Sequence, residues 1–378
     1  MNYKTLLKII NDRTAKIGVI GLGYVGLPLA ITFANKGFSV TGFDVDPKKI
    51  DQLMEGRSYI KHIENNIIQQ HIFSKTLTVS YDFSLLGEMS AIVICVPTPL
   101  NHVREPDLSY LDATARTIAS HLRIGQLVVL ESTTYPGCCE EVVKPVLEES
   151  GLISAKDFYL AYSPEREDPG NPEFSTTDIP KVVGGDGSKA LKVAIALYDQ
   201  IIVETVPVST MDVAEAVKLT ENIFRAVNIA LINEFSIIFN KLGINTEEVL
   251  EAAGTKWNFL QFRPGLVGGH CIGVDPYYLT HKSIEVGYKP EIILAGRRLN
   301  DNMGTYVAEQ VSILMTKKHI PIVDSNVLIM GLTFKENCPD LRNTRVIDLI
   351  EKFESLNANV DVYDPWVDKD EAYHEYNI

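Results

Sequence analysis

The segment that most constrains the fold of this chain is Gly-Leu-Gly-Tyr-Val-Gly at residues 21–26. It closes a short apolar, β-rich run that begins at Lys16 and opens a helix-like stretch that reaches about Lys36. In a G-x-G-x-x-G at such a junction, the first glycine makes a tight turn, the second admits a pyrophosphate, and the third lets the helix pack on the strand. The segment therefore predicts a βαβ unit that binds a dinucleotide at its helix N-terminus.

An acid at the end of the next strand supports this interpretation. The run at 38–43 ends at Asp44, whose carboxylate can accept hydrogen bonds from an adenosine ribose. No arginine stands beside Asp44 to bind a 2′-phosphate, which favours NAD over NADP. The alternative is a glycine-rich turn that binds no cofactor.

The rest of the chain alternates between strand-like and helical segments. Strand-like runs recur at 77–79, 91–96, 127–130, 158–161 and 181–183. This alternation is typical of a mainly parallel, doubly wound sheet. Residues 211–242 contain no Gly or Pro and predict one long helix that ends at Gly243, and a second helix is expected from Pro290 to Lys318.

A second β/α segment follows these helices. We expect a strand at 326–330, a helix at 344–356 and a strand at 359–363, and "VYDP" at 362–365 answers "FDVDP" at 43–47. The predicted fold is α/β, with two Rossmann-like doubly wound domains joined by a long central helix and a helical middle domain. The expected domains are 1–206, 207–318 and 319–378, and the third is expected to lack its last elements because the chain ends at Ile378.

Composition excludes several classes of partner. The chain of 378 residues carries 35 Lys and Arg against 49 Asp and Glu, a net charge of −14, which argues against binding to nucleic acid or anionic membranes. Five cysteines at irregular spacing indicate reduced thiols. No run reaches the roughly 20 apolar residues of a membrane helix. We therefore expect a cytoplasmic protein. We expect no metal, because His270 lacks matching zinc ligands.

The glycine-rich loop at 263–276 holds Cys271 and, four residues on, Asp275. Cys271 is either a thiol nucleophile that attacks an aldehyde or a small buried apolar residue. Lys218 and Asn222 share a helix face, which could stabilise an oxyanion or simply be solvated.

Polar residues also follow two of the predicted strands. Thr133 comes after the run at 127–130, and Glu165 with Arg166 comes after the run at 158–161. A doubly wound sheet binds ligands at such strand ends. The alternative is that each of these residues only caps its loop.

Several motifs together resemble the UDP-glucose/GDP-mannose dehydrogenase family, whose members oxidise the C6 alcohol of a nucleotide sugar to a carboxylate. The resemblance runs from about Lys16 to Asp368. It rests on G-L-G-Y-V-G-L-P at 21–28, V-P-T-P at 96–99, S-T-T-Y-P-G at 132–137, G-G-H-C-I-G-V-D-P at 268–276 and G-L-T-F-K-E-N-C-P-D-L-R-N-T at 331–344.

The resemblance implies a role for individual residues. Cys271 looks like the nucleophile, Asp275 like the carboxylate that assists thioester hydrolysis, and Lys218 with Asn222 like the pair that stabilises the charged oxygen. Thr133 matches a threonine that positions water, and Glu165 matches an acid/base or water-ordering glutamate. The implied cofactor site for NAD comprises Gly21, Gly23, Tyr24, Val25, Gly26, Asp44, Pro97, Thr98 and Thr133. The implied substrate site comprises Arg166, Lys218, Asn222, Phe262, Arg263, Gly268, Lys335 and Arg342.

Two departures from the UDP-glucose branch bear on the sugar. Ile272 replaces an aromatic residue and Val274 replaces a lysine, which looks like the UDP-N-acetylhexosamine branch. The implied activity is a four-electron oxidation of UDP-N-acetylglucosamine through a cysteine thiohemiacetal and thioester, for bacterial or archaeal surface polysaccharides. Alternatives are UDP-glucose, UDP-N-acetylgalactosamine or UDP-N-acetylmannosamine as substrate, or a nucleotide-sugar-binding protein without turnover.

An apolar stripe on the central helix concerns assembly. Its members step by three and four along the helix: Phe224, Val227, Leu231, Phe235 and Ile238. The stripe either packs on its own lobe or against a second copy, and the family resemblance points to dimers. We therefore expect a two-fold homodimer through this helix.

Overall fold

The computed structural model describes residues 2–60, 63–166, 177–269, 272–336, 338 and 340–378. The chain divides into two compact units, Met1–Lys218 and Leu219–Ile378, which are described separately. This division falls inside the central helix rather than at the expected boundaries, and the three-domain scheme stays a proposal.

The N-terminal unit is built on one sheet. Among the described residues it has eight strands, in the order β3-β2-β1-β4-β5-β6-β7-β8. The strands are β1 (Lys16–Ile20), β2 (Ser39–Phe43), β3 (Leu77–Ser80), β4 (Ala91–Ile94), β5 (Leu127–Leu130), β6 (Tyr159–Tyr162), β7 (Lys181–Gly185) and β8 (Thr205–Pro207). Neighbours are parallel except β6 and β7. The first six strands have the Rossmann order, which confirms the predicted sheet.

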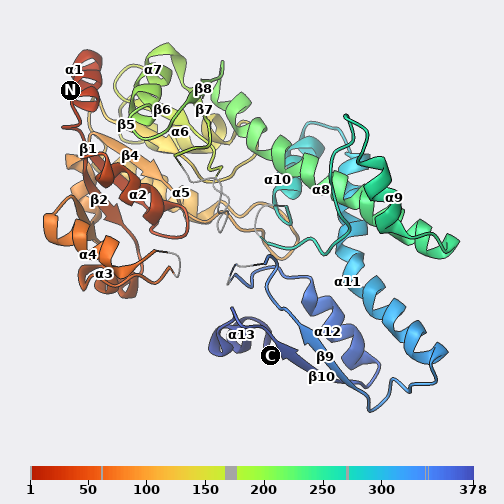
Figure 1. Cartoon of the computed structure of the whole chain (residues 1–378). Helices are drawn as coiled ribbons and strands as arrows, with labels where there is room; N and C mark the ends of the chain where they lie inside the picture. The colour runs from red at the N-terminus through yellow and green to blue at the C-terminus, as the bar shows by residue number, and fades with distance from the viewer. Residues whose placement is uncertain (1, 61–62, 167–176, 270–271, 337, 339) are drawn as a thin grey trace. The chain divides into compact units, whose positions relative to one another are not determined.

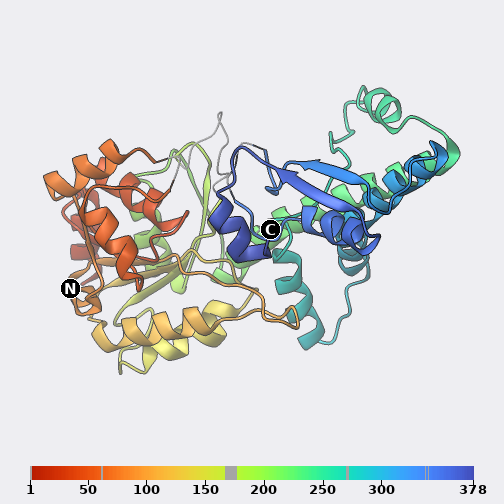
Figure 2. The same ribbon diagram turned by 90° about the horizontal axis from the view of Figure 1, so that it is seen from below.

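Helices cover both faces of this sheet, as Figures 1 and 2 show. One face packs against α1 (Tyr3–Asn11), α2 (Gly26–Asn35) and α7 (Gly187–Tyr198) in a single apolar core. Helices α3 (Pro47–Met54) and α4 (Asn65–Ser74) pack near β3. The opposite face lies against α5 (Ser109–His121) and α6 (Lys144–Glu148), which follows a π-helical turn at Cys139–Val143. Because both faces are covered, β4, β5 and β6 are buried along their whole length.

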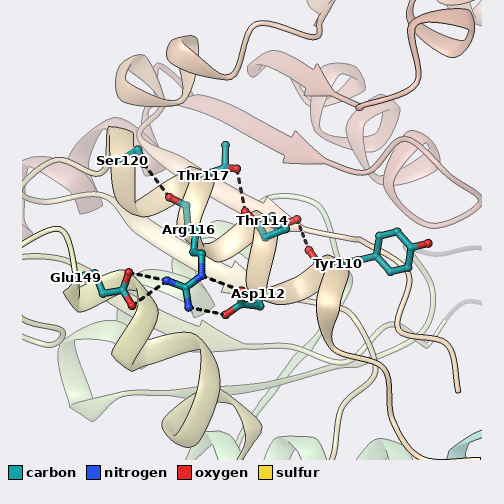
Figure 3. Close-up of polar contacts among 8 residues, drawn as sticks. Tyr110, Asp112, Thr114, Arg116, Thr117, Ser120 and Glu149 are labelled. Atoms are coloured by element: carbon teal, nitrogen blue, oxygen red, sulfur yellow. Dashed lines mark hydrogen bonds and ion pairs between the residues drawn. The ribbon is translucent and has the colours of Figure 1, made fainter. Parts of the chain in front are cut away.

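The surface of α5 carries an ion-pair cluster that joins it to the end of α6 (Figure 3). Arg116 Nε donates to Asp112 Oδ2 at 2.8 Å, one turn back on α5. Its Nη1 donates to Glu149 Oε2 at 2.8 Å. All three side chains are exposed, so water and dissolved ions screen the attraction between their charges.

The C-terminal unit combines long helices with a small sheet. Its helices are most of α8 (Met211–Leu242), α9 (Thr246–Ala253), α10 (Asp275–Glu285), α11 (Glu291–Lys317), α12 (Val346–Ser355) and α13 (Lys369–Tyr376). Helices α8 and α11 confirm the two long helices expected from the sequence. In the described part of this unit, β9 (Asn326–Met330) and β10 (Asn359–Tyr363) pair in parallel, with α12 between them in sequence. They confirm the predicted second βαβ segment.

Helix α8 is also the one described helix whose length and composition would allow it to cross a membrane, with a mean hydropathy of 1.3 over 18 residues. One such helix is weak evidence, because a helix of a water-soluble core passes the same test. The buried polar residues of α8, Glu215, Lys218, Asn222 and Asn233, are hydrogen-bonded within the protein.

Candidate functional site

The glycine turn after β1 has the geometry expected of a dinucleotide site. Gly21 has φ +90°, and a Cβ atom there would lie 2.5 Å from the Cys95 carbonyl oxygen. A Cβ at Gly26, the first residue of α2, would lie 1.9 Å from the Gly21 oxygen. A Cβ at Gly23 would meet nothing within 4 Å, which leaves room for a phosphate. No side chain caps the N-terminus of α2 at Val25, and the neighbouring Tyr24 is exposed, so the turn fits NAD.

Asp44 is buried at the end of β2 and closes this turn. Its Oδ2 accepts from the Leu22 amide at 2.9 Å and from Lys49 Nζ at 3.2 Å. Its Oδ1 accepts from the Asp46 amide at 3.0 Å. Sequence reasoning missed Lys49, because its contact with Asp44 depends on the orientation of α3, which carries Lys49. The site therefore pairs the acid with a nearby cation.

Tyr59 packs on the same turn. Its hydroxyl donates to the Leu22 carbonyl oxygen at 2.5 Å, and Lys49 Nζ lies 6.0 Å from its ring centroid. Burial raises the pKa of Tyr59 well above its usual value, and the charges of Asp44 and Asp46 add to the effect. The phenol therefore remains a hydrogen-bond donor at neutral pH.

Two loops meet beyond the carboxyl ends of β4 and β5. Ser132 Oγ donates to the Val96 carbonyl oxygen at 2.7 Å. Thr98 Oγ1 donates to the Thr133 carbonyl oxygen at 2.8 Å. These bonds bring Thr98 and Thr133 together at the edge of the sheet where a Rossmann domain binds its ligand, with Pro97 exposed beside them.

Helix α8 holds the second of these loops through Glu215. This fully buried carboxylate accepts from the amides of Gly137 at 2.6 Å and Cys139 at 2.9 Å, and from Thr134 Oγ1 at 3.4 Å. Burial raises the pKa of Glu215 to about 7, against the backbone hydrogen bonds, which lower it. Sequence reasoning missed Glu215; the available signal was an acid three residues before Lys218, one turn back on the same helix.

The turn after β6 brings Glu165 and Lys218 together. Lys218 Nζ donates to the Glu165 carbonyl oxygen at 2.5 Å, and Arg166 Nη1 donates to the Pro180 carbonyl oxygen at 2.5 Å. Lys218 and Asn222 are only 7% and 6% exposed, so a solvated helix face is the wrong interpretation for this pair.

In the C-terminal unit the structure joins Asn222 to Asp275. Asn222 Nδ2 donates to Asp275 Oδ2 at 2.5 Å, and both residues are buried. Asp275 is the first residue of α10, so the glycine-rich loop delivers it to α8. Cys271 and His270 lie outside the described residues.

The segment at 331–344 packs on the glycine-rich loop. A Cβ at Gly268 would lie 2.6 Å from the Asn343 carbonyl oxygen and 3.0 Å from Phe334 Cβ. Arg342 lies on this segment, where its Nη2 is 2.6 Å from Asp340 Oδ2. Lys335 accepts from Thr333 Oγ1 through its carbonyl oxygen at 3.0 Å. The structure therefore brings Gly268 to the segment that carries Lys335 and Arg342, two of the predicted substrate residues.

The other two predicted substrate residues contact their own neighbourhood. The ring of Phe262 lies edge-on to that of Phe224, with the centroids 6.2 Å apart. Arg263 Nη1 lies 2.7 Å from Glu247 Oε1 in an exposed ion pair. Neither contact tests a role in substrate binding.

Arg297 is a further polar residue near the loop that the sequence did not point to. It is buried on α11, pairs with Asp301, and lies 5.4 Å from the Tyr277 ring centroid. Its Nη1 donates to the Ile272 carbonyl oxygen at 3.4 Å. Across the described residues, no three or more His, Cys, Asp or Glu side chains group as metal ligands.

Three family models match the chain. They are the NAD binding, central and UDP binding domains of the UDP-glucose/GDP-mannose dehydrogenase family, at residues 15–202, 212–302 and 328–378. The glycine turn lies in the first segment, the Asn222–Asp275 pair in the second, and Arg342 in the third.

Relatives of known name span most of the chain. UDP-N-acetyl-D-glucosamine 6-dehydrogenase of Salmonella typhi is 50% identical over 365 residues, which cover 96% of this chain and 85% of that protein. The protein of the same name from Pseudomonas aeruginosa is 49% identical over 365 residues, covering 96% and 86%. The solved structure of UDP-D-ManNAc dehydrogenase from Pyrococcus horikoshii has a TM-score of 0.87 at 34% identity, covering 93% of this chain and 84% of that one.

Proposed function

This chain belongs to the UDP-glucose/GDP-mannose dehydrogenase family, and from that premise we propose that it oxidises the C6 alcohol of UDP-N-acetylglucosamine to a carboxylate. It is an NAD-dependent UDP-sugar dehydrogenase. The observation that carries the choice of sugar is the identity of about half over 96% of the chain with two relatives named for UDP-N-acetyl-D-glucosamine. Ile272 and Val274 in the glycine-rich loop support the same choice.

The cofactor site takes NAD through the N-terminal unit. NAD, when bound, accepts a hydride in each of the two oxidation steps. The amides at the start of α2 would hold its pyrophosphate, and the Asp44 carboxylate would accept from its adenosine ribose. Thr98 and Thr133 line the edge of the sheet beyond β4 and β5.

The chemistry on the sugar depends on Cys271. Loss of a hydride from C6 and of a proton from its hydroxyl group first gives the C6 aldehyde. The Cys271 thiolate attacks this aldehyde and forms a C–S bond while the carbonyl oxygen takes up a proton, giving a thiohemiacetal. Loss of a hydride from C6 leaves a thioester, and water then attacks the thioester carbon. The C–S bond breaks, the thiolate leaves, and the carboxylate is released. The overall reaction consumes two NAD and one water for each alcohol oxidised.

The surrounding polar residues stabilise charge and order water in this scheme. Lys218 and Asn222 donate to the sugar oxygen as negative charge develops on it. Asp275 assists the attack of water, and its hydrogen bond with Asn222 orients its carboxylate. Glu165 and Thr133 order the water or move its proton.

A panel of UDP-sugars followed by NADH absorbance at 340 nm tests the choice of substrate. We expect the highest kcat/KM with UDP-N-acetylglucosamine. Higher values with UDP-glucose, UDP-N-acetylgalactosamine or UDP-N-acetylmannosamine would replace that substrate while keeping the activity. No NADH with any of them would indicate a binding protein without turnover. The product, a UDP-uronic acid, suits the synthesis of bacterial or archaeal surface polysaccharides.

We further propose a two-fold homodimer, in the cytoplasm, that forms through α8. Phe224, Leu231 and Ile238 of its apolar stripe are exposed in the single chain. A second copy packed on this stripe would remove that apolar surface from water. Light scattering at micromolar concentration should report about twice the 42.0 kDa of one chain. An active species at the mass of one chain would refute the dimer.

A further inference from the structure

A buried ion pair lies in the N-terminal unit next to the turn that carries Glu165. Lys181 Nζ is 2.9 Å from Glu131 Oε2, and the side chains are 7% and 2% exposed. Tyr198 OH donates to the other oxygen, Glu131 Oε1, at 2.5 Å. Taking both charges out of water is costly, and a buried pair often adds no net stability over apolar residues. Stability alone therefore gives no reason for these charges.

The ammonium group of Lys181 has a second acceptor, which suggests such a reason. Its Nζ donates to the Pro164 carbonyl oxygen at 3.3 Å. The next carbonyl oxygen along the chain, that of Glu165, accepts from Lys218 Nζ. Two lysines from different elements thus hold two consecutive carbonyl groups of one turn.

The flanking residues of the turn are held from the same side. Ser163 Oγ donates to the Val182 carbonyl oxygen at 2.8 Å, and Arg166 Nη1 donates to that of Pro180. Each of the four residues at 163–166 is therefore bound to the segment at 180–182 or to α8. Lys181 lies at the centre of these contacts, because its Nζ also donates to Glu131 Oε2 and is thereby oriented between the pair and the turn.

We propose that Lys181, oriented by Glu131, is a positioning residue that sets the direction of Glu165. This inference rests on the proposed role of Glu165 in ordering water or moving its proton. A charge-assisted hydrogen bond to a carbonyl group is stronger than a neutral one. Loss of the bond frees the peptide next to Glu165, and a displacement of about 1 Å at a reacting group can reduce the rate about 100-fold.

The test separates the effect of the Lys181–Pro164 hydrogen bond on kcat from the effect of the Glu131–Lys181 pair on Tm. Lys181→Met alone leaves the Glu131 charge buried without its partner, so we expect a lower Tm and a lower kcat. The double variant Glu131→Gln/Lys181→Met removes that charge and keeps an acceptor for Tyr198, so we expect the Tm to recover. Its kcat should stay about 100-fold low, because the Pro164 carbonyl group still lacks its donor. The Kd values for NAD and the UDP-sugar should match wild type.

Two further variants serve as controls for this interpretation. Tyr198→Phe removes a hydrogen bond from Glu131 but leaves the Lys181–Pro164 contact, so the Tm should fall while kcat is kept. Lys181→Arg retains a cation with several donors and should restore most of the kcat lost in Lys181→Met, which keeps the proposal testable if the double variant does not fold.

The outcomes are distinct. A double variant that regains wild-type kcat together with its Tm would show that the pair is only structural and overturn the inference. A folded Lys181→Arg variant as slow as Lys181→Met would do the same. Glu165→Gln is measured in parallel to keep the two proposals apart. Wild-type turnover in Glu165→Gln would remove both the proposed role of Glu165 and this inference, whereas a slow Glu165→Gln beside a fast double variant would remove this inference alone.

Discussion

The βαβ segments at the two ends of the chain share one turn geometry. In each, a glycine with positive φ follows the first strand: Gly21 at +90° and Gly331 at +102°. Each glycine amide donates to the carbonyl oxygen of the last residue of the second strand. Gly21 donates to Phe43 and Gly331 to Tyr363, both at 2.8 Å. Each acid after that strand binds the amide after the glycine: Asp44 that of Leu22 at 2.9 Å, and Asp364 that of Leu332 at 2.7 Å. The local sequence, a glycine and an acid at matching places, therefore determines the turn in both segments.

Their surroundings differ sharply. Strands β1 and β2 lie inside the large sheet, and the last four residues of β1 are buried. Strands β9 and β10 alternate between partly buried and exposed residues, with Leu328, Met330 and Tyr363 all exposed. Asp44 also pairs with Lys49, whereas the additional partner of Asp364 is the amide of Thr333. The same turn is thus built once in a core and once near a surface, and burial depends on how many elements lie beside it.

The largest difference between the two sheets should appear in their apolar side chains. Ile94 on β4 is fully buried, and Met330 on β9 is 75% exposed. Ile94→Ala is expected to lower the free energy of unfolding by about 2–5 kcal/mol. The matched Met330→Ala should change it by no more than about 0.5 kcal/mol. Urea denaturation measures both, and similar losses would mean that a further element covers β9.

The next effect concerns the acid in the N-terminal turn. Asp44→Ala should weaken NAD binding about 10- to 150-fold, which corresponds to the loss of about 1.5–3 kcal/mol from a charge-assisted hydrogen bond. Discrimination against NADP should fall as well, because the repulsive carboxylate is gone and Lys49 remains. Titration calorimetry provides both affinities. Unchanged NAD affinity would place Asp44 outside the cofactor site.

The matching acid in the C-terminal turn should affect stability instead. Asp364→Asn is expected to lower the free energy of unfolding by about 1 kcal/mol at pH 7 and to leave NAD affinity unchanged. Burial raises the pKa of Asp364, but the amides of Leu332, Trp366 and Thr333 lower it more, and the net pKa is depressed. Such a group stabilises the fold above its unfolded pKa of about 4, and the effect disappears as pH falls through the lower folded value.

Melting curves of wild type and Asp364→Asn between pH 7 and pH 3 follow this loss. Their separation should be constant down to about pH 4 and should shrink below it. A separation that grows as the solution becomes more acidic would contradict the depressed pKa.

The smallest effect is expected at the exposed cluster on α5. Arg116→Gln breaks the contacts to Asp112 and Glu149 (Figure 3), yet the Tm and kcat should stay almost unchanged, since exposed ion pairs add little. Comparison with Lys181→Met in the buried pair measures how burial changes the effect on Tm of losing a charged partner. A large fall in Tm for Arg116→Gln would mean that α5 and α6 depend on this cluster.

The sequence predicted features that depend on local pattern. Hydrophobic runs and turn residues located β1, β2, β9 and α8 to within a residue or two, because periodicity and glycine positions act over short distances. The antiparallel direction of β7 was not predicted, since strand direction depends on the path of the chain between strands.

The site was predictable in part for the same reason. Lys218 and Asn222 were recognised as sharing one helix face, but their local sequence did not show whether that face is solvated, and the structure shows that both residues are buried. Glu215 and Lys181 were missed, because a charged residue in a sequence is usually solvated and its buried partner comes from a distant segment. The contact between Lys49 and Asp44 was missed for a related reason, because it depends on how α3 is oriented against β2.

The central claim, oxidation of a UDP-sugar alcohol to the acid through Cys271, is tested most directly by the amount of NADH and uronic acid formed per UDP-N-acetylglucosamine consumed. The wild-type protein should form two NADH per sugar and release the UDP-uronic acid, identified by its mass. Cys271→Ser should form almost no uronic acid while its Kd for NAD stays that of wild type. Uronic acid formation by Cys271→Ser at the wild-type rate would contradict the account.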